Sequence, residues 1–219
     1  DAGKNVRSGV DEKTGLPVVS LYGQRKRPTP EMLADIDLLV FDLQDVGTRF
    51  YTYISSMHYL MEACAEEGKT FVVCDRPNPN DFIDGPILEP DCRSFIGVDP
   101  LPVAHGMTVG ELALMIDGER WLRGGNTCRV KVIPMDGWSH GDPYELPVRP
   151  SPNLPNSRSI ELYPSLCFFE ATIMSVGRGT SKPFQAIGYP DKRFGSIVYT
   201  PQIKIGEDSN PRHKGRLCY

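Results

Sequence analysis

The feature that most constrains the fold is a strand–helix–strand pattern in the first third of the chain. Residues 38–41 (LLVF) form an unbroken apolar run that ends in Asp42, a pattern typical of a strand buried on both faces of a parallel sheet. From about residue 50 to 67, apolar residues recur at three- and four-residue steps, which predicts a helix. A second apolar strand follows at 70–74. Because this connection is long enough for a parallel crossover, we expect an α/β fold with a parallel sheet and flanking helices.

The remaining predicted elements are shorter and are separated by long loops. We expect strands at 17–22, 101–104, 128–133, 184–187 and 197–205, and helices that start at Pro30, run from Val109 to about Ile116, and lie within 159–172. Four prolines between 147 and 155 indicate a linker or domain edge. We therefore expect one domain at 1–149 and the beginning of a smaller α/β domain at 150–219.

Composition and charge argue against several classes of protein. The net charge of −4 is spread along the chain without a basic stripe, which disfavours nucleic acid as a partner. No apolar run is long enough to cross a bilayer. The six cysteines lack zinc-ligand spacing, and Cys64 and Cys74 are expected to be core residues. The chain begins at Asp1 without Met and stops at Tyr219 without a terminating feature, so we expect truncation at both ends.

Polar residues follow three of the predicted strands. Asp42 ends the first strand, Asp75 the second, and His105 a third, short one. If these strands are parallel neighbours, the three side chains lie in one crevice at the carboxyl edge of the sheet, where such folds bind ligands. Each residue alone is also a common turn or helix-capping residue. The three positions together favour a functional crevice.

The loops around this edge supply further candidates. Gln44 and Asp45 lie in the loop after the first strand. Arg49 and Arg76 could pair with the aspartates, or bind an anionic group of a substrate. Tyr51 could form an aromatic wall against a sugar, or pack in the core.

Candidates also occur outside the strand ends. Asn153 sits in a proline-rich turn, where it could hold a ligand or simply form the turn. Glu170 lies among apolar residues, so we expect it to be paired with an arginine such as Arg178 or to be catalytic. Asn78, in the loop after the second strand, is placed with the substrate-binding candidates. His58, inside the predicted helix, is expected at the surface or its boundary.

Several catalytic signatures are missing from the sequence. Residues 177–180 (GRGT) lack the third glycine of a dinucleotide fingerprint, and there is no Walker loop and no GxSxG elbow. Asp42 and Asp45 are spaced by three rather than by the two residues that aspartyl phosphotransferases use. We therefore expect no nucleotide cofactor. A metal-dependent phosphoesterase with Asp42, Asp75 and His105 as ligands remains an alternative.

Seven segments occur in the order found in one bacterial family. They are FDLQDVGTRFYTY (41–53), DRPNP (75–79), DGPILEP (84–90), HGMTVGEL (105–112), PSPNLP (150–155), FFEAT (168–172) and GRGTSKPF (177–184). In this order they resemble the NamZ/YbbC-type exo-β-N-acetylmuramidases, and the resemblance extends from about residue 9 to residue 219.

The resemblance implies a Rossmann-like domain without a nucleotide, a smaller second domain, and an active cleft between them. It implies release of N-acetylmuramic acid from the non-reducing end of peptidoglycan fragments, without a cofactor. It also implies an exported protein, periplasmic or extracellular. The glutamate favoured as the catalytic acid of this family lies in a Pro-Glu-His-Gly segment that would precede position 1 of this chain.

With that glutamate upstream, the residues named above are assigned the other roles. The catalytic candidates are Asp42, Asp45, His105 and Glu170, and the substrate-binding candidates are Gln44, Arg49, Tyr51, Asp75, Arg76, Asn78, Asn153 and Arg178. We expect Arg49 or Arg178 to bind the lactyl carboxylate, because a planar guanidinium matches a carboxylate and muramic acid differs from glucosamine by that group. The alternative hypothesis is that the chain is a non-catalytic protein that binds cell-wall saccharides.

Overall fold

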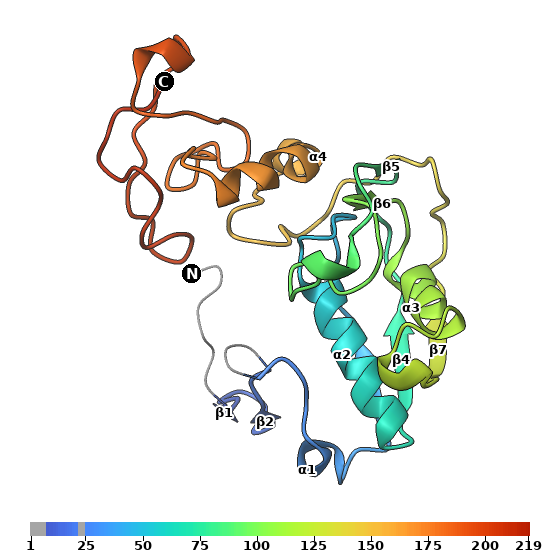
Figure 1. Ribbon diagram of the computed structural model, residues 1–219. Helices are drawn as coiled ribbons and strands as arrows, with labels where there is room; N and C mark the ends of the chain where they lie inside the picture. Colours follow the sequence, from blue (N-terminus) through green and yellow to red (C-terminus); the bar gives the residue numbers. More distant parts are fainter. Residues whose placement is uncertain (1–7, 22–24) are drawn as a thin grey trace.

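The computed structural model describes residues 8–21 and 25–219 (Figure 1). The strands are β1 (Gly9–Val10), β2 (Pro17–Val18), β3 (Leu38–Phe41), β4 (Thr70–Cys74), β5 (Ile83–Asp84), β6 (Ala104–His105) and β7 (Arg129–Ile133). The α-helices are α1 (Pro30–Leu33), α2 (Tyr53–Glu66), α3 (Val109–Gly118) and α4 (Ser157–Leu166). Short 3-10 turns lie at Pro90–Cys92, Arg123–Gly125, Cys167–Ala171 and Lys192–Phe194. None of the helices in these described ranges is both long and apolar enough to cross a membrane.

The centre of the fold is a three-stranded parallel sheet in the order β3-β4-β7. Phe41 pairs with Val73 between the first two strands, and Cys74 pairs with Ile133 between the last two. Helix α2 connects β3 to β4, and α3 lies between β4 and β7 in the chain. The predicted α/β fold with a parallel sheet and flanking helices is confirmed.

Both long helices cover the same face of this sheet. Phe71 and Val73 are fully buried in one cluster with residues of α2 and α3. The two helices also contact each other (Figure 1). On the opposite face, Leu38 is 49% and Val40 is 52% exposed. The expectation that 38–41 is buried on both faces is therefore wrong for β3, because the helices of the described chain supply only one layer.

Local hydrogen bonds explain where α3 begins. The Thr108 hydroxyl accepts a hydrogen bond from the Glu111 amide, and the Glu111 carboxylate accepts one from the Thr108 amide, so the expected capping box is present. Asp75, at the end of β4, reaches the same helix start. Gly110 is needed there, because a Cβ at this position would lie 2.7 Å from the Asp75 carboxyl carbon.

The strand that carries His105 belongs to a separate hairpin. Strand β6 pairs antiparallel with β5, and His105 lies opposite Ile83. The loop at 47–49 runs alongside, because the His105 amide donates to the Gly47 carbonyl and the Arg49 amide donates to the Val103 carbonyl. The predicted strand at 101–104 is thus displaced to 104–105, outside the parallel sheet.

The C-terminal part, drawn orange to red in Figure 1, consists of α4 and long loops. The predicted strands at 184–187 and 197–205 are wrong. The structure has only isolated bridges in or next to these ranges, such as Tyr199 with Cys218 and Ser175 with Gly188. Phe184 also has a φ of 52°, which no strand residue adopts. The predicted helix within 159–172 is confirmed as α4 and the 3-10 turn that follows it.

A second apolar cluster joins the C-terminal part to the loop after β3. Val46 packs in it with Leu154, Ile160 and other buried residues. The Asn80 side-chain amide donates to the carbonyls of Val46 (2.8 Å) and Ile160 (2.9 Å), which ties α4 to that loop. The division of the chain at 149/150 stays a prediction.

Candidate functional site

The aspartates at the ends of β3 and β4 are both engaged within the chain. The Asp42 carboxylate accepts from Nε (3.0 Å) and Nη2 (2.6 Å) of Arg76, and both side chains are exposed. Asp75 accepts from the Thr108 hydroxyl at 3.0 Å and from the Gly110 amide at 2.8 Å. Asp75 is therefore a cap for α3, which was the ordinary explanation for an aspartate at this place.

The expected crevice of Asp42, Asp75 and His105 was built on a wrong premise. The third parallel strand is β7, whereas His105 lies in the β5–β6 hairpin. Its imidazole binds Asp45, so each of the three residues has a different partner. No group of three or more His, Cys, Asp or Glu residues in the described ranges could hold a metal ion. The structure brings together no ligand set for the phosphoesterase alternative.

Asp45 and His105 form a buried pair beside the loop at 44–49. His105 Nε2 lies 3.1 Å from Asp45 Oδ2, and the two residues are 1% and 5% exposed. The Met107 amide donates to His105 Nδ1, so Nε2 carries the proton that is donated to Asp45. The Gly47 amide also donates to Oδ2, at 2.7 Å. Asp45 Oδ1 has no hydrogen-bond partner among the described residues, which leaves one oriented acceptor at this site.

Gln44 and Asn78 hold the same loop in place. The Gln44 amide nitrogen donates to the carbonyls of Asp45 (2.8 Å) and Pro77 (2.9 Å). Asn78 donates to the Met107 carbonyl and accepts from the Asn80 amide. Both ends of the Asn78 side chain are therefore used to build the loop.

Arg49 and Tyr51, two further predicted substrate contacts, also have internal partners. Arg49 is 6% exposed, and its Nη1 donates to the carbonyls of Pro86 (3.0 Å) and Leu101. Burial lowers the pKa of Arg49. The Tyr51 hydroxyl donates to the Pro150 carbonyl at 2.7 Å, and burial raises the pKa of this phenol.

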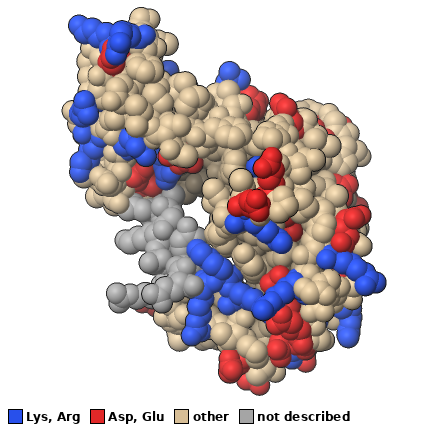
Figure 2. Space-filling model, viewed as in Figure 1, with Lys and Arg blue, Asp and Glu red and all other residues tan. Residues whose placement is uncertain are grey.

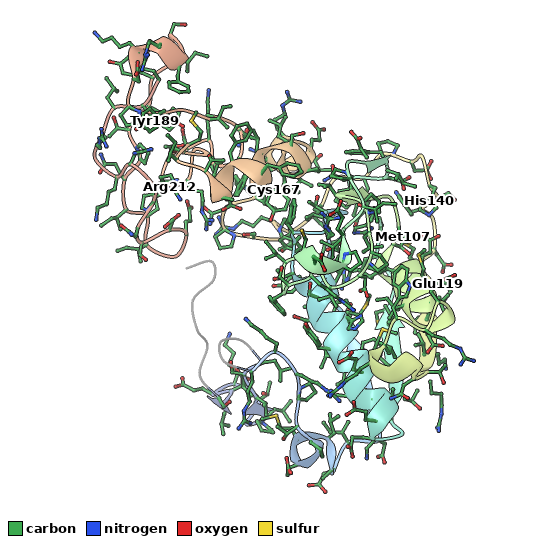
Figure 3. All side chains as sticks on the ribbon, in the orientation of Figure 1. Met107, Glu119, His140, Cys167, Tyr189 and Arg212 are labelled. Carbon is green, nitrogen blue, oxygen red and sulfur yellow. The ribbon has the colours of Figure 1, made fainter. Side chains whose placement is uncertain are left out.

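Arg178 lies in a different setting, at the wall of an open cavity. Its Nη1 is 2.6 Å from Glu170 Oε1, and its Nε is 3.0 Å from Asp208 Oδ2. Of the two roles expected for Glu170, pairing with an arginine such as Arg178 is the one that the structure shows. The cavity has a volume of about 550 Å³ and is lined by Glu170, Met174, Ser175, Val176, Arg178, Asp208, Asn210, Pro211, Arg212, His213 and Lys214. Figure 3 places Arg212 among the C-terminal loops, away from Met107 and His140.

Aromatic rings connect this cavity to the loop after β3. The ring centroids of Tyr51 and Tyr163 are 6.2 Å apart, and those of Tyr163 and Phe184 are 5.0 Å apart. The Arg178 guanidinium lies 6.0 Å from the centroid of Phe184. Three successive contacts therefore lead from a predicted substrate residue to the cavity wall.

Asn153 approaches the same segment of the chain from the proline-rich turn. Its side-chain nitrogen donates to the Glu207 carbonyl at 3.2 Å, next to Asp208. Its Oδ1 is buried and has no partner in the described part of the chain. Asn153 thus has a fixed acceptor that no described protein group uses.

The sequence reasoning misplaced His58 and missed part of the cavity wall. His58 is fully buried, with Nδ1 2.9 Å from Asp99 and Nε2 3.2 Å from Glu62, so its placement at the surface is wrong. Burial lowers the pKa of His58, but hydrogen bonds to Asp99 and Glu62 more than compensate and raise it to about 9. The four-residue spacing of His58 and Glu62 was the available signal. For Arg212 and Lys214, nothing in the sequence indicated that they lie near Arg178.

Comparisons with known proteins cover the whole chain. Residues 1–158 match the family described as "Exo-beta-N-acetylmuramidase NamZ, N-terminal", and residues 161–219 match the corresponding C-terminal family. A Bacillus subtilis (strain 168) protein named "Peptidoglycan beta-N-acetylmuramidase NamZ" is 52% identical over 241 aligned positions. That alignment covers 100% of this chain and 56% of the relative.

Two crystal structures from Bacteroides fragilis NCTC 9343, both of DUF1343 family proteins, have the same fold. The first has a TM-score of 0.91 and is 48% identical in sequence. The match covers 96% of this chain and 58% of the chain in that crystal structure. The second has a TM-score of 0.84 and is 35% identical in sequence. The match covers 95% of this chain and 58% of the chain in that crystal structure. The chain thus spans little more than half the length of these relatives.

Proposed function

The chain belongs to the NamZ exo-β-N-acetylmuramidase family, and from this premise we propose that it serves the hydrolysis of peptidoglycan fragments at non-reducing-end N-acetylmuramic acid. The observation that carries the proposal is the 52% identity, over the whole chain, to a protein named as a peptidoglycan β-N-acetylmuramidase. The chain spans 56% of the length of that relative. We therefore propose, rather than transfer, the activity of the full-length relative for this protein.

Within this proposal, the chain contributes residues that position the sugar. Asp45 supports the assignment, since its Oδ2 is fixed by His105 and Gly47 while Oδ1 stays unpaired among the described residues. Because this oriented acceptor is buried, it suits an internal water molecule rather than direct contact with the sugar. The resemblance assigns the main proton donor to the glutamate of a Pro-Glu-His-Gly segment, and no such segment occurs in the 219 residues.

A second candidate function is saccharide binding without cleavage. Glycosidases need two carboxyl groups that flank the scissile bond. Asp42, Asp75 and Glu170 are each engaged with Arg76, the start of α3 and Arg178, respectively. This use of the carboxylates favours binding as the role of the 219-residue chain by itself.

The substrate also bears on where the protein works. Peptidoglycan lies outside the cytoplasmic membrane, so a periplasmic or extracellular location is part of the proposal. Fractionation of cells that express the protein, followed by immunodetection, tests it, and detection in the cytoplasm alone would reject an exported protein.

A chromogenic β-glycoside of N-acetylmuramic acid tests the activity. We expect a chain extended to the full length of the relatives to release the chromophore, and to leave the corresponding N-acetylglucosamine glycoside largely intact. The 219-residue chain should bind the sugar but turn it over far more slowly. Equal activity on both glycosides, or none on either by the extended chain, contradicts the proposed function.

A further inference from the structure

The cavity around Arg178 has a charge that the protein does not balance. Glu170 and Asp208 both pair with Arg178, at 2.6 and 3.0 Å. Arg212 and Lys214 line the same cavity, are exposed, and have no ion pair among the described residues. Both carboxylates of the cavity thus pair with Arg178. The two other cations of the lining can form charge-assisted hydrogen bonds with a bound anion.

The wall of the cavity is held in one shape by backbone geometry. Gly177 and Gly179, on either side of Arg178, have φ values of 75° and 77°. A Cβ on Gly179 would lie 2.4 Å from the Gln202 carbonyl oxygen and 2.6 Å from Pro211, so only glycine permits this packing. An arginine fixed between two carboxylates on such a backbone is organised before any ligand arrives.

The rest of the lining is suited to a substituted sugar rather than to a bare anion. Met174, Val176 and Pro211 present apolar surface, which accommodates methyl groups. Asn210 and the carboxylates of Glu170 and Asp208 offer acceptors or donors for hydroxyl and amide groups. A volume of about 550 Å³ lies within the range of small-molecule sites.

Arg49, the other arginine considered for an acidic substituent, is a poor candidate. It is 6% exposed, and its Nη1 is used by the carbonyls of Pro86 and Leu101. The side chain of Arg178 is 27% exposed. Nη2 of Arg178 makes no hydrogen bond or ion pair with a described residue.

We propose that this cavity binds the non-reducing-end sugar by its lactyl carboxylate, through Arg212, Lys214 and the open edge of Arg178. The inference rests on the proposed function and extends it: the residues that distinguish muramic acid from glucosamine lie in the C-terminal part of the chain. The lactyl methyl and the acetamido methyl lie against the apolar wall formed by Met174, Val176 and Pro211.

Calorimetric titration with three related sugars tests the inference. The probes are N-acetylmuramic acid, its methyl ester, which keeps the shape but loses the charge, and N-acetylglucosamine. We expect the chain to bind the free acid roughly tenfold more tightly than the ester, as charge-assisted hydrogen bonds imply. Raising the salt concentration should reduce this preference.

The variant R212Q/K214Q removes the two unpaired charges without breaking an ion pair of the described structure. It should bind the acid and the ester equally and keep the affinity of the original chain for the ester. R178Q should lose the same preference, but it also releases Glu170 and Asp208. R158Q is the matched control, because Arg158 is exposed on α4 and its one ion pair among the described residues is with Glu161. It should bind all three sugars like the original chain.

Three results overturn the inference: equal binding of acid and ester by the original chain, no binding of the acid at millimolar concentration, or a preference for the acid that survives in R212Q/K214Q. Hydrolysis of the chromogenic glycoside tests the proposed function separately. Hydrolysis without a carboxylate preference rejects this inference alone, whereas a carboxylate preference without hydrolysis by the extended chain rejects the catalytic proposal alone.

Discussion

The sheet-bearing part and the C-terminal part differ in what their buried or cavity-lining carboxylates hold: a helix start and a histidine in the first, and an arginine at a cavity wall in the second. Around the sheet, Asp75 caps α3 and Asp45 pairs with a buried histidine. In the C-terminal part, which has little regular structure, Arg178 is held by two carboxylates while Arg212 and Lys214 have no ion pair in the described chain. Near the ends of strands and the starts of helices, backbone amides donate hydrogen bonds to carboxylates such as those of Asp75 and Asp45. Lys and Arg side chains are exposed in both parts (Figure 2), and in the C-terminal part Arg212 and Lys214 line a cavity.

The largest expected effect concerns the apolar core of the sheet-bearing part. F71A removes a fully buried ring packed against α2 and α3, so it should lower the free energy of unfolding by about 3–5 kcal/mol. V40A, on the exposed face of β3, should cost less than about 1 kcal/mol. Urea denaturation measures both, and similar losses for the two variants would contradict the one-sided sheet.

The next effect concerns His58, which lies between Asp99 and Glu62. H58Q leaves two buried carboxylates without their cation, so the loss of stability should be roughly 3 kcal/mol. The folded-state pKa of about 9 lies above the ordinary value of 6.5. This contribution to stability is therefore complete below about pH 6.5 and is lost as the pH rises through 9.

Denaturation curves between pH 6 and pH 10 separate this contribution from the rest. The original chain should lose stability across that interval more steeply than H58Q does. Parallel curves for the two proteins would show that His58 is not held as a cation.

A smaller effect distinguishes a structural aspartate from a substrate contact. D75A removes the acceptor for the Thr108 hydroxyl and the Gly110 amide, so it should cost about 1–2 kcal/mol. The affinity for N-acetylmuramic acid, measured by calorimetry at a temperature where the variant is folded, should stay unchanged. A clear loss of affinity without a loss of stability would return Asp75 to the substrate-binding set.

The smallest effect is expected at the exposed pair of Asp42 and Arg76. R76Q should change the free energy of unfolding by less than about 1 kcal/mol, because the two side chains are 54% and 41% exposed. Thermal unfolding and sugar titration of the same sample are sufficient to check it. Were sugar affinity to fall strongly while stability holds, the edge of the sheet would be a binding surface after all.

The sequence predicted the elements that have their own periodic or capping signals. The helix expected at about 50–67 and found at 53–66, the strand at 70–74 and the capping box at Thr108 follow from local pattern and hydrogen-bonding chemistry. The exposed face of β3 could not be predicted, because local sequence does not specify that α2 and α3 pack on the same face of the sheet. The strands expected at 184–187 and 197–205 failed for a similar reason: apolar residues there pack as loops without a partner strand.

The candidate site was predictable only where two partners lie close in the sequence. Glu170 and Arg178 are eight residues apart, and their pairing was expected. The contact of Asp45 with His105 spans 60 residues and depends on the antiparallel β5–β6 hairpin. Asp208 pairs with Arg178, and Arg212 and Lys214 line the same cavity, although no periodicity in the sequence places these three residues there.

The central claim is that the C-terminal cavity, and not the edge of the parallel sheet, recognises the acidic sugar. Amide chemical-shift mapping of the isotope-labelled 219-residue chain, titrated with N-acetylmuramic acid, tests this directly. The account predicts the largest shifts at 170–178 and 208–214, with smaller shifts near Asn153 and Asp45. Shifts confined to 42–49 and 75–78, with none around Arg178, would contradict it.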